Sequence, residues 1–180
     1  MSMNLVLTLT GTDRIGIVDE ITGSFLEIGG NIEASRMSRL GGEFAMIMLV
    51  TLPVDKRSAL DQTVAGLTRR GYKVTTTQTE ASGVVSHQGW HPYRLEVSGA
   101  DHEGIVNRIA HTLSEHGINI ETADTDSTHA PNSGILLFAM RARVLVPPHL
   151  DEGAWRQSLT DVAQEQHVDI VIEPAPEALS

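Results

Sequence analysis

The chain has 180 residues and no cysteine, so it suits one or two small domains and excludes disulfides, thiolate chemistry and cysteine-ligated metals. Its net charge of −10 is uneven, with eight basic and nine acidic side chains in residues 1–90 against five and 14 in residues 91–180. The acidic half would be repelled by a phosphate backbone, so direct binding to DNA is not expected. No apolar run is long enough for a bilayer and no signal segment is evident, which predicts a soluble cytoplasmic protein.

The chain repeats itself at an offset of 88 residues. Thr10–Ile21 returns as Ser98–Ile109, with identities at glycine, aspartate and aliphatic positions, and Gly29–Glu33 returns as Gly117–Glu121. A repeat of this length, with identities clustered at turns, indicates one structural unit used twice.

The first copy begins with a strand and a helix. Alternating leucines predict a strand over Asn4–Leu9. Thr12 or Asp13 can cap the helix that follows, because a short side-chain oxygen accepts from an unpaired amide of the first turn. The helix is expected to bury one stripe of apolar side chains, formed by Val18, Ile21, Phe25 and Ile28.

Two strands, a helix and a last strand complete the first copy. The polar segment Asn31–Leu40 is expected at a sheet edge or an interface, whereas the apolar run Phe44–Val50 suggests a central strand with both faces covered. A helix opened by Pro53 follows, and Tyr72–Thr79 is typical of a strand. The helix is expected to turn three residues inward: Leu60, Val64 and Leu67.

The second copy has the same order of elements with a longer hairpin, Ser127–Gly134. Its predicted strands are Tyr93–Ser98, Asn119–Asp126, Ile135–Val146 and Val168–Ile172. Its predicted inward helix residues are Ile105, Ile109 and Leu113, then Trp155, Leu159 and Val162. The order β-α-β-β-α-β predicts an α+β chain of two tandem ferredoxin-like domains with antiparallel sheets. The expected boundaries are domain 1 over 1–80, a linker over 81–92, domain 2 over 93–174 and a tail over 175–180.

Several functions of this topology fail on residue type. Copper carriers and ferredoxins need cysteines. RNA recognition needs stacking aromatics in basic surroundings, but Phe44 and Phe138 are isolated. Acyl-phosphate hydrolysis needs an arginine and a glycine-rich cradle in the first loop, and only the first copy offers Arg14, with His102 at the matching place. No nucleophile–base pair or phosphate loop is evident either, so the chain is not expected to be an enzyme.

Eight histidines are present, but their spacing does not suggest a shared ligand set. His87 and His91 are loosely spaced, and His111 and His116 fall on different parts of a helix. Neither a metal site nor a cofactor is expected.

Both Asp-x-x-Gly-Ile-Val loops, each followed by a helix and Gly-x-Asn-Ile-Glu, resemble the tandem ACT domains that bind amino acids. The resemblance is closest over Thr10–Leu49, through Asp13–Val18, Asn31–Arg36 and Leu40–Phe44, which resemble the family of glycine cleavage system transcriptional repressors. That resemblance implies two ACT domains without a DNA-binding module, acting on a partner transcription activator. Because lone four-stranded sheets leave strand edges unpaired, we also expect the tandem domains to pair and the chains to form homodimers.

The loop itself suits an amino acid. Free amides at residues 14–17, at the positive end of the helix dipole, suit a carboxylate, and a glycine allows close approach. An aspartate of the loop could hold the α-ammonium, and the asparagine of the next strand offers a donor and an acceptor. The expected ligand-binding residues are Thr12, Asp13, Arg14, Gly16, Ile17, Asn31 and Ile32 in the first copy, and Asp101, His102, Gly104, Ile105, Asn119 and Ile120 in the second.

The same residues also have purely structural interpretations. Asp13 and Asp101 are possible helix caps, Gly16 and Gly104 could allow helix and sheet to pack closely, and asparagines commonly serve turns. The hypothesis taken from the sequence is a non-enzymatic regulator that senses a small amino acid, glycine or serine favoured. It is expected to regulate transcription of glycine cleavage through a partner protein. The alternatives are a regulatory subunit of an amino-acid biosynthetic enzyme and a ligand-free assembly scaffold.

Overall fold

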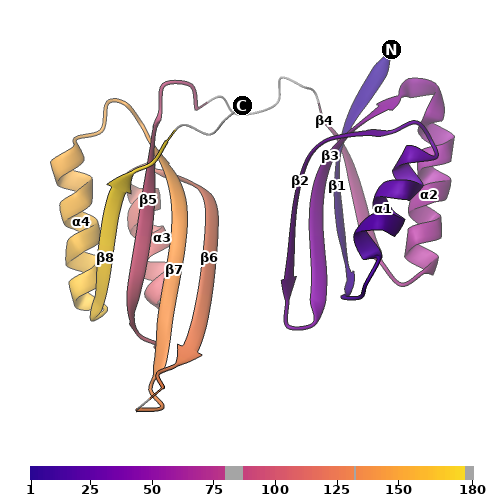
Figure 1. The fold of residues 1–180 in the computed structure, drawn as a ribbon. Coiled ribbons are helices and arrows are strands. Elements are labelled where there is room, and N and C mark those ends of the chain that lie inside the picture. Colours follow the sequence, from indigo (N-terminus) through magenta and orange to yellow (C-terminus); the bar gives the residue numbers. More distant parts are fainter. Residues whose placement is uncertain (80–86, 132, 177–180) are drawn as a thin grey trace. The chain divides into compact units, whose positions relative to one another are not determined.

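The computed structural model describes residues 1–79, 87–131 and 133–176. The chain divides into two compact units, Met1–Val85 and Ser86–Ser180. Each unit holds a four-stranded antiparallel sheet with two helices packed on one face (Figure 1). The predicted fold, two tandem ferredoxin-like domains, is confirmed.

The first unit follows the predicted order, with a short 3-10 turn before its second helix. Its strands stand in the order β2-β3-β1-β4, so β1 and β3 are central and β2 lies at an edge, as its polar sequence predicts. The elements are β1 (Ser2–Thr12), α1 (Ile17–Leu26), β2 (Asn31–Leu40), β3 (Glu43–Pro53), η1 (Val54–Lys56), α2 (Arg57–Arg69) and β4 (Lys73–Thr79).

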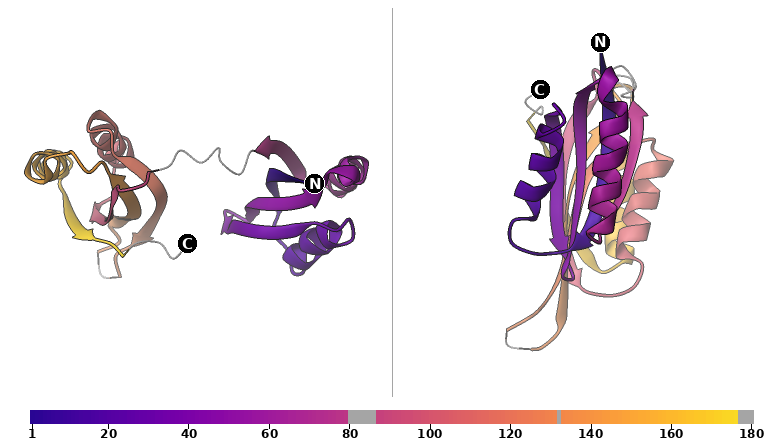
Figure 2. Two further views of the ribbon diagram at one scale, coloured as in Figure 1. Left: turned by 90° about the horizontal axis from the view of Figure 1, so that it is seen from above. Right: turned by 90° about the vertical axis from the view of Figure 1, so that its right-hand side faces the viewer.

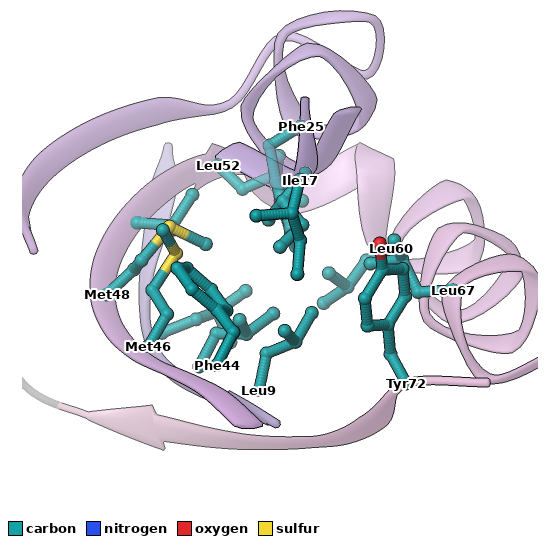
Figure 3. Close-up of a cluster of buried hydrophobic side chains, with 14 of the residues drawn as sticks. Leu9, Ile17, Phe25, Phe44, Met46, Met48, Leu52, Leu60, Leu67 and Tyr72 are labelled. Atoms are coloured by element: carbon teal, nitrogen blue, oxygen red, sulfur yellow. The ribbon is translucent and has the colours of Figure 1, made fainter. Parts of the chain in front are cut away.

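The core of the first unit lies between this sheet and its two helices (Figure 3). Alternate residues of β1 and β3 point inward, and Leu9, Val50 and Leu52 are completely buried. They meet Phe25 of α1 and Leu67 of α2. Burying each such side chain contributes roughly 1.5–3 kcal/mol, so this aliphatic layer holds helices and sheet together.

Two expectations about this core are wrong. The buried stripe of α1 runs through Ile17, Ile21 and Phe25, while Val18 is 36% exposed. Residues four apart share one face of a helix, so Ile17 lies with Ile21 and Phe25, and the adjacent Val18 is turned about 100° away. Within its own unit, the central strand β3 is covered on one face only. Ile47 points away from the helices and is 46% exposed, so a continuous apolar run here does not signify burial on both faces.

The second unit repeats the arrangement, with strand order β6-β7-β5-β8. Its predicted inward residues are buried or packed against the core, and Trp155 of α4 is 1% exposed against the ring of Tyr93. Figure 2 gives two further views of the layers in each unit. The elements are β5 (His91–Ala100), α3 (Ile105–Glu115), β6 (Asn119–His129), β7 (Leu136–Val146), α4 (Glu152–Glu165) and β8 (Val168–Pro174).

Local signals explain how the elements of the second unit begin. Asp151 precedes α4 and its Oδ1 accepts from the amide of Ala154 at 2.7 Å, which satisfies one free donor of the first turn. Strand β5 starts at His91, two residues before the predicted start of the domain, and pairs there with Val146.

Residues 81–86 of the predicted linker and 177–180 of the predicted tail lie outside the described residues.

Candidate functional site

The loop between β1 and α1 is held by a hydrogen bond across the sheet end. Asp13 donates its amide to the carbonyl of Gly42 at 3.0 Å, and its Oδ2 accepts from Arg39 at 3.3 Å. The residue that stands before the helix is Gly16, and no side chain caps α1. The expectation that Thr12 or Asp13 caps this helix is therefore wrong, because the carboxylate is turned to the β2–β3 hairpin.

The second loop reproduces this arrangement at equivalent positions. Asp101 donates its amide to the carbonyl of Leu136 at 2.8 Å, and its Oδ2 accepts from the Ser127 hydroxyl at 2.9 Å. In both copies the partner lies 26 residues after the aspartate. The repeated aspartate thus ties its loop to the neighbouring hairpin, a role that neither the capping nor the ligand interpretation anticipated.

The glycines of the two loops are required by backbone geometry. Gly16 has φ of 85° and Gly104 has φ of 97°, in the left-handed region where other residues are strained. A Cβ at Gly16 would meet no atom within 4 Å, and one at Gly104 would lie 3.8 Å from the side chain of Gln166. Close packing of helix and sheet is therefore not the reason for glycine, and the space over the backbone of Gly16 is open.

The first turns of α1 and α3 each contain backbone amides without an intrahelical acceptor. The first intrahelical bond of α1 runs from the Glu20 amide to the Gly16 carbonyl at 3.0 Å, so the three preceding amides of the helix have no intrahelical acceptor. In α3 the corresponding bond joins Arg108 and Gly104 at 2.9 Å. Ile17 and Ile105, both predicted site residues, are buried in the core, so only their backbones can serve a ligand.

Arg14 of the first loop takes part in a cluster that sequence reasoning missed. Its guanidinium contacts Glu20 and donates to the Tyr72 hydroxyl at 2.8 Å. Glu20 also accepts from Arg70 at 2.8 Å and from the Tyr72 hydroxyl at 3.0 Å. The cluster joins the start of α1 to the end of α2, and its members are too far apart in sequence for a spacing argument to connect them.

The matching position in the second loop carries His102, whose ring bridges two backbone carbonyls. Nε2 lies 2.7 Å from the Gln166 oxygen at the end of α4, and Nδ1 lies 3.0 Å from the Glu103 oxygen. Carbonyl oxygens only accept, so both ring nitrogens can donate only when the imidazole is protonated. The bond to Gln166 first, and that to Glu103 second, therefore raise the pKa of His102 above 6.5, against a smaller opposing effect of desolvation.

The predicted asparagines do not join the loops within a domain. Asn31 pairs with Thr51, which pairs with Asn4, whereas the loop follows Thr12 at the other end of β1. Eight residues of strand separate the two ends, about 26 Å at roughly 3.3 Å per residue. Asn119 is equally distant from the second loop, because its partner Leu145 pairs with Pro92. The expectation of one intradomain site made by loop and asparagine is wrong.

Asn31 and its neighbours form a separate polar group at that far end. The Asn31 side-chain amide donates to Glu33 at 3.3 Å, and the Thr51 hydroxyl lies 2.8 Å from the same carboxylate. Ile32 and Ile120, also predicted as site residues, pack against the cores of their units. A ligand at the first loop therefore does not touch Asn31 or Ile32 of the same domain.

In residues 1–79, 87–131 and 133–176, no group of three or more histidine or acidic side chains is arranged to hold a metal ion. Within the same residues, no helix has the length and apolarity needed to cross a membrane.

Both halves of the chain match models of the ACT domain, over residues 3–72 and 93–152. The chain therefore belongs to the ACT-domain family and carries two ACT domains in tandem.

Among proteins of this family, the chain is similar over its length to the glycine cleavage system transcriptional repressor of Escherichia coli K12. The two are 27% identical over 183 residues, covering 93% of this chain and 90% of the relative. A crystal structure of an unknown protein from Galdieria sulphuraria is 34% identical, with a TM-score of 0.85 over 98% of this chain and 100% of that one. A crystal structure attributed to a glycine cleavage system transcriptional repressor has a TM-score of 0.71 over 98% and 99% of the two chains; at 18% identity it supports the fold alone.

Proposed function

We propose that the protein is a non-enzymatic, cytoplasmic regulator that binds a small amino acid and transmits its state to a protein partner. The observation that carries this proposal is the similarity, over 93% of this chain, to the glycine cleavage system transcriptional repressor, in a chain that carries two ACT domains. Glycine is the first candidate ligand and serine the second.

The loop geometry supports an amino-acid ligand. No side chain caps α1 or α3, and the free amides of their first turns can donate to a carboxylate. The candidate residues of these two loops are Thr12, Asp13, Arg14, Gly16 and Ile17, and Asp101, His102, Gly104 and Ile105. Asn31, Ile32, Asn119 and Ile120 lie at the other ends of the sheets and would serve a second region of the surface.

The proposed mode of regulation acts through a protein rather than through DNA. Residues 91–180 carry five basic and 14 acidic side chains, a balance that opposes the phosphate backbone. Regulation of glycine cleavage genes would therefore require a transcription activator as partner. A homodimer of the chain is part of the same proposal, since the edge strands β2 and β6 each leave one side unpaired within their own sheets.

The test is affinity capture of the tagged full-length protein from its own cells, with and without millimolar glycine. We expect a transcription activator in the captured fraction, with a retained amount that changes when glycine is added. Capture of an amino-acid biosynthetic enzyme instead would support the alternative of a regulatory subunit. Retention of the activator that is identical at every amino-acid concentration would contradict the sensing role.

A further inference from the structure

The first unit has a cavity of about 220 Å³ on the sheet face that points away from the helices. It lies beside the first loop and is lined by Thr10, Gly11, Thr12, Glu43, Gly71 and Lys73. The buried neighbours Leu9, Phe44 and Tyr72 belong to the core on the other side of the sheet. Because side chains alternate along a strand, Thr10, Glu43 and Lys73 must face the cavity side.

Strand register places one cation and one anion on opposite sides of this cavity. Lys73 of β4 is opposite Thr10 of β1, and Glu43 of β3 is opposite Thr12 of β1. Within the residues that the structure describes, neither Lys73 nor Glu43 forms an ion pair. Two opposite charges thus face the same cavity without neutralising each other.

The spacing of these charges matches an α-amino acid. β4 and β3 flank β1, so their backbones are about 9.5 Å apart, twice the usual separation of neighbouring strands. The partners of Lys73 and Glu43 on β1 are two residues apart, so the backbone positions of these two residues are separated diagonally by about 11–12 Å. The nitrogen and carboxyl carbon of an α-amino acid lie about 2.5 Å apart. Adding one charge-assisted contact of about 2.8 Å on each side gives roughly 8 Å, which the long side chains of Lys73 and Glu43 can span.

The rest of the cavity favours a small ligand. Thr10 and Thr12 each offer a hydroxyl that can donate and accept. Gly71 leaves its part of the wall open, since a Cβ there would meet no atom within 4 Å. Gly11 has no room for a side chain on the core side, where a Cβ would lie 2.6 Å from the Tyr72 ring.

The second unit has a cavity at the equivalent place, but its charges differ. This cavity, of about 390 Å³, is lined by Ser98 and Gly99, which match Thr10 and Gly11 in the repeat. Asp169 stands opposite Ser98 as Lys73 stands opposite Thr10. Leu137 takes the place of Glu43, because each directly precedes a phenylalanine that pairs with the matching glycine. These pairs are Phe138 with Gly99 and Phe44 with Gly11. Asp169 thus stands in place of the cation Lys73, and the aliphatic Leu137 stands in place of the anion Glu43. A ligand carboxylate is therefore repelled from the cavity of the second unit.

We infer that the cavity of the first unit binds one small zwitterionic α-amino acid, with Lys73 on its carboxylate and Glu43 on its ammonium. The cavity of the second unit does not bind this ligand, so each chain holds one such site. This inference rests on the proposed amino-acid function and adds a site beside the first predicted loop, with which it shares Thr12.

Calorimetric titration of the full-length protein with glycine tests the inference. We expect binding at this cavity to be roughly five- to tenfold weaker in Lys73→Gln and in Glu43→Gln, as for charge-assisted contacts at a partly exposed site. Lys56→Gln and Glu27→Gln remove the same charges from exposed positions outside the cavity and should bind like the wild type. Glycinamide, which lacks the carboxylate, should bind weakly to the wild type and lose little further affinity in Lys73→Gln.

A spectroscopic measurement locates the ligand independently of any substitution. The sequence has two lysines, Lys56 and Lys73, so ¹³C-labelled lysine gives one probe in the cavity and one control. Glycine should shift the side-chain signal of Lys73 and leave that of Lys56 in place. If glycine binds the wild type but neither variant loses affinity, or if the Lys73 signal does not move, the assignment to this cavity is overturned while the proposed function stands. If no amino acid binds the wild type, the proposed function falls with it.

Discussion

Gly16 and Gly23 are seven residues apart at the start of and within helix α1, yet replacing each with alanine should change stability in opposite directions. Gly16 has φ of 85°, and a Cβ in this conformation costs about 1–2 kcal/mol. Gly23 is inside α1, where alanine is favoured by roughly 0.5–1 kcal/mol and a Cβ would meet no atom within 4 Å.

Gly16→Ala should therefore lower the melting temperature by about 2–8 °C, and Gly23→Ala should raise it by about 1–4 °C, at roughly 2–4 °C per kcal/mol for a chain of this size. Both shifts are measured by circular dichroism of the full-length variants. Equal shifts of the same sign would show that backbone conformation is not the reason for glycine at position 16.

His102 should make stability depend on pH. Its folded pKa lies above 6.5 because the carbonyls of Gln166 and Glu103 accept from both ring nitrogens. A raised pKa stabilises the folded state fully below pH 6.5, and this contribution disappears as the pH rises through the folded pKa. The melting temperature of His102→Gln should fall below that of the wild type at pH 5.5, and the difference should shrink by pH 8.5. A difference that is constant over this range would contradict the bridging role.

At the scale of single elements, helix α4 is capped by Asp151. Asp151 accepts from the Ala154 amide at 2.7 Å, and replacing such a cap with alanine costs about 1 kcal/mol. Asp151→Ala should therefore destabilise the second unit, while Asp151→Asn keeps an acceptor and should stay near the wild type. The fluorescence of buried Trp155, in a Trp90→Phe background, reports unfolding of this unit. Equal stability of the alanine and asparagine variants would show that the cap contributes nothing.

The elements themselves could be predicted from the sequence because hydrophobic periodicity and the repeat agree. The aliphatic stripes of both copies predicted helices, strands and cores, with small errors such as Val18 in place of Ile17. The covered face of β3 could not be predicted, since a run of apolar residues does not reveal what packs on each side of a sheet. Ile47 is apolar and still exposed.

The candidate site was harder to predict because it depends on register and direction. The repeat identified the loops at Asp13 and Asp101, but it did not show that strand β2, which begins at Asn31, starts at the opposite end of the sheet from the first loop. Helix α1 carries the chain from the loop back along the sheet, and β2 begins at the end that the helix reaches, which sets that separation. The placement of Lys73 and Glu43 on either side of one cavity follows only from the register of three strands, and sequence spacing does not reveal it.

At the scale of the whole molecule, charge sets the expected behaviour toward nucleic acid. With a net charge of −10, the purified protein should not retard duplex DNA in an electrophoretic assay at physiological salt. Salt-sensitive, submicromolar binding by the protein alone would contradict a role that depends on a protein partner. The basic protein lysozyme at the same concentration serves as the positive control for non-specific retardation.

The central claim, that the folded protein binds a small amino acid, is tested most directly by its melting temperature in the presence of glycine. A ligand that binds only the folded state stabilises it by about 2.7 kcal/mol at 100 times its dissociation constant. At roughly 2–4 °C per kcal/mol, saturating glycine should raise the melting temperature by about 5–11 °C. Sodium acetate and methylammonium chloride, which supply the two charges separately, should produce no such shift at equal concentration. An unchanged melting temperature with glycine, serine and every other amino acid at millimolar concentration would contradict the account.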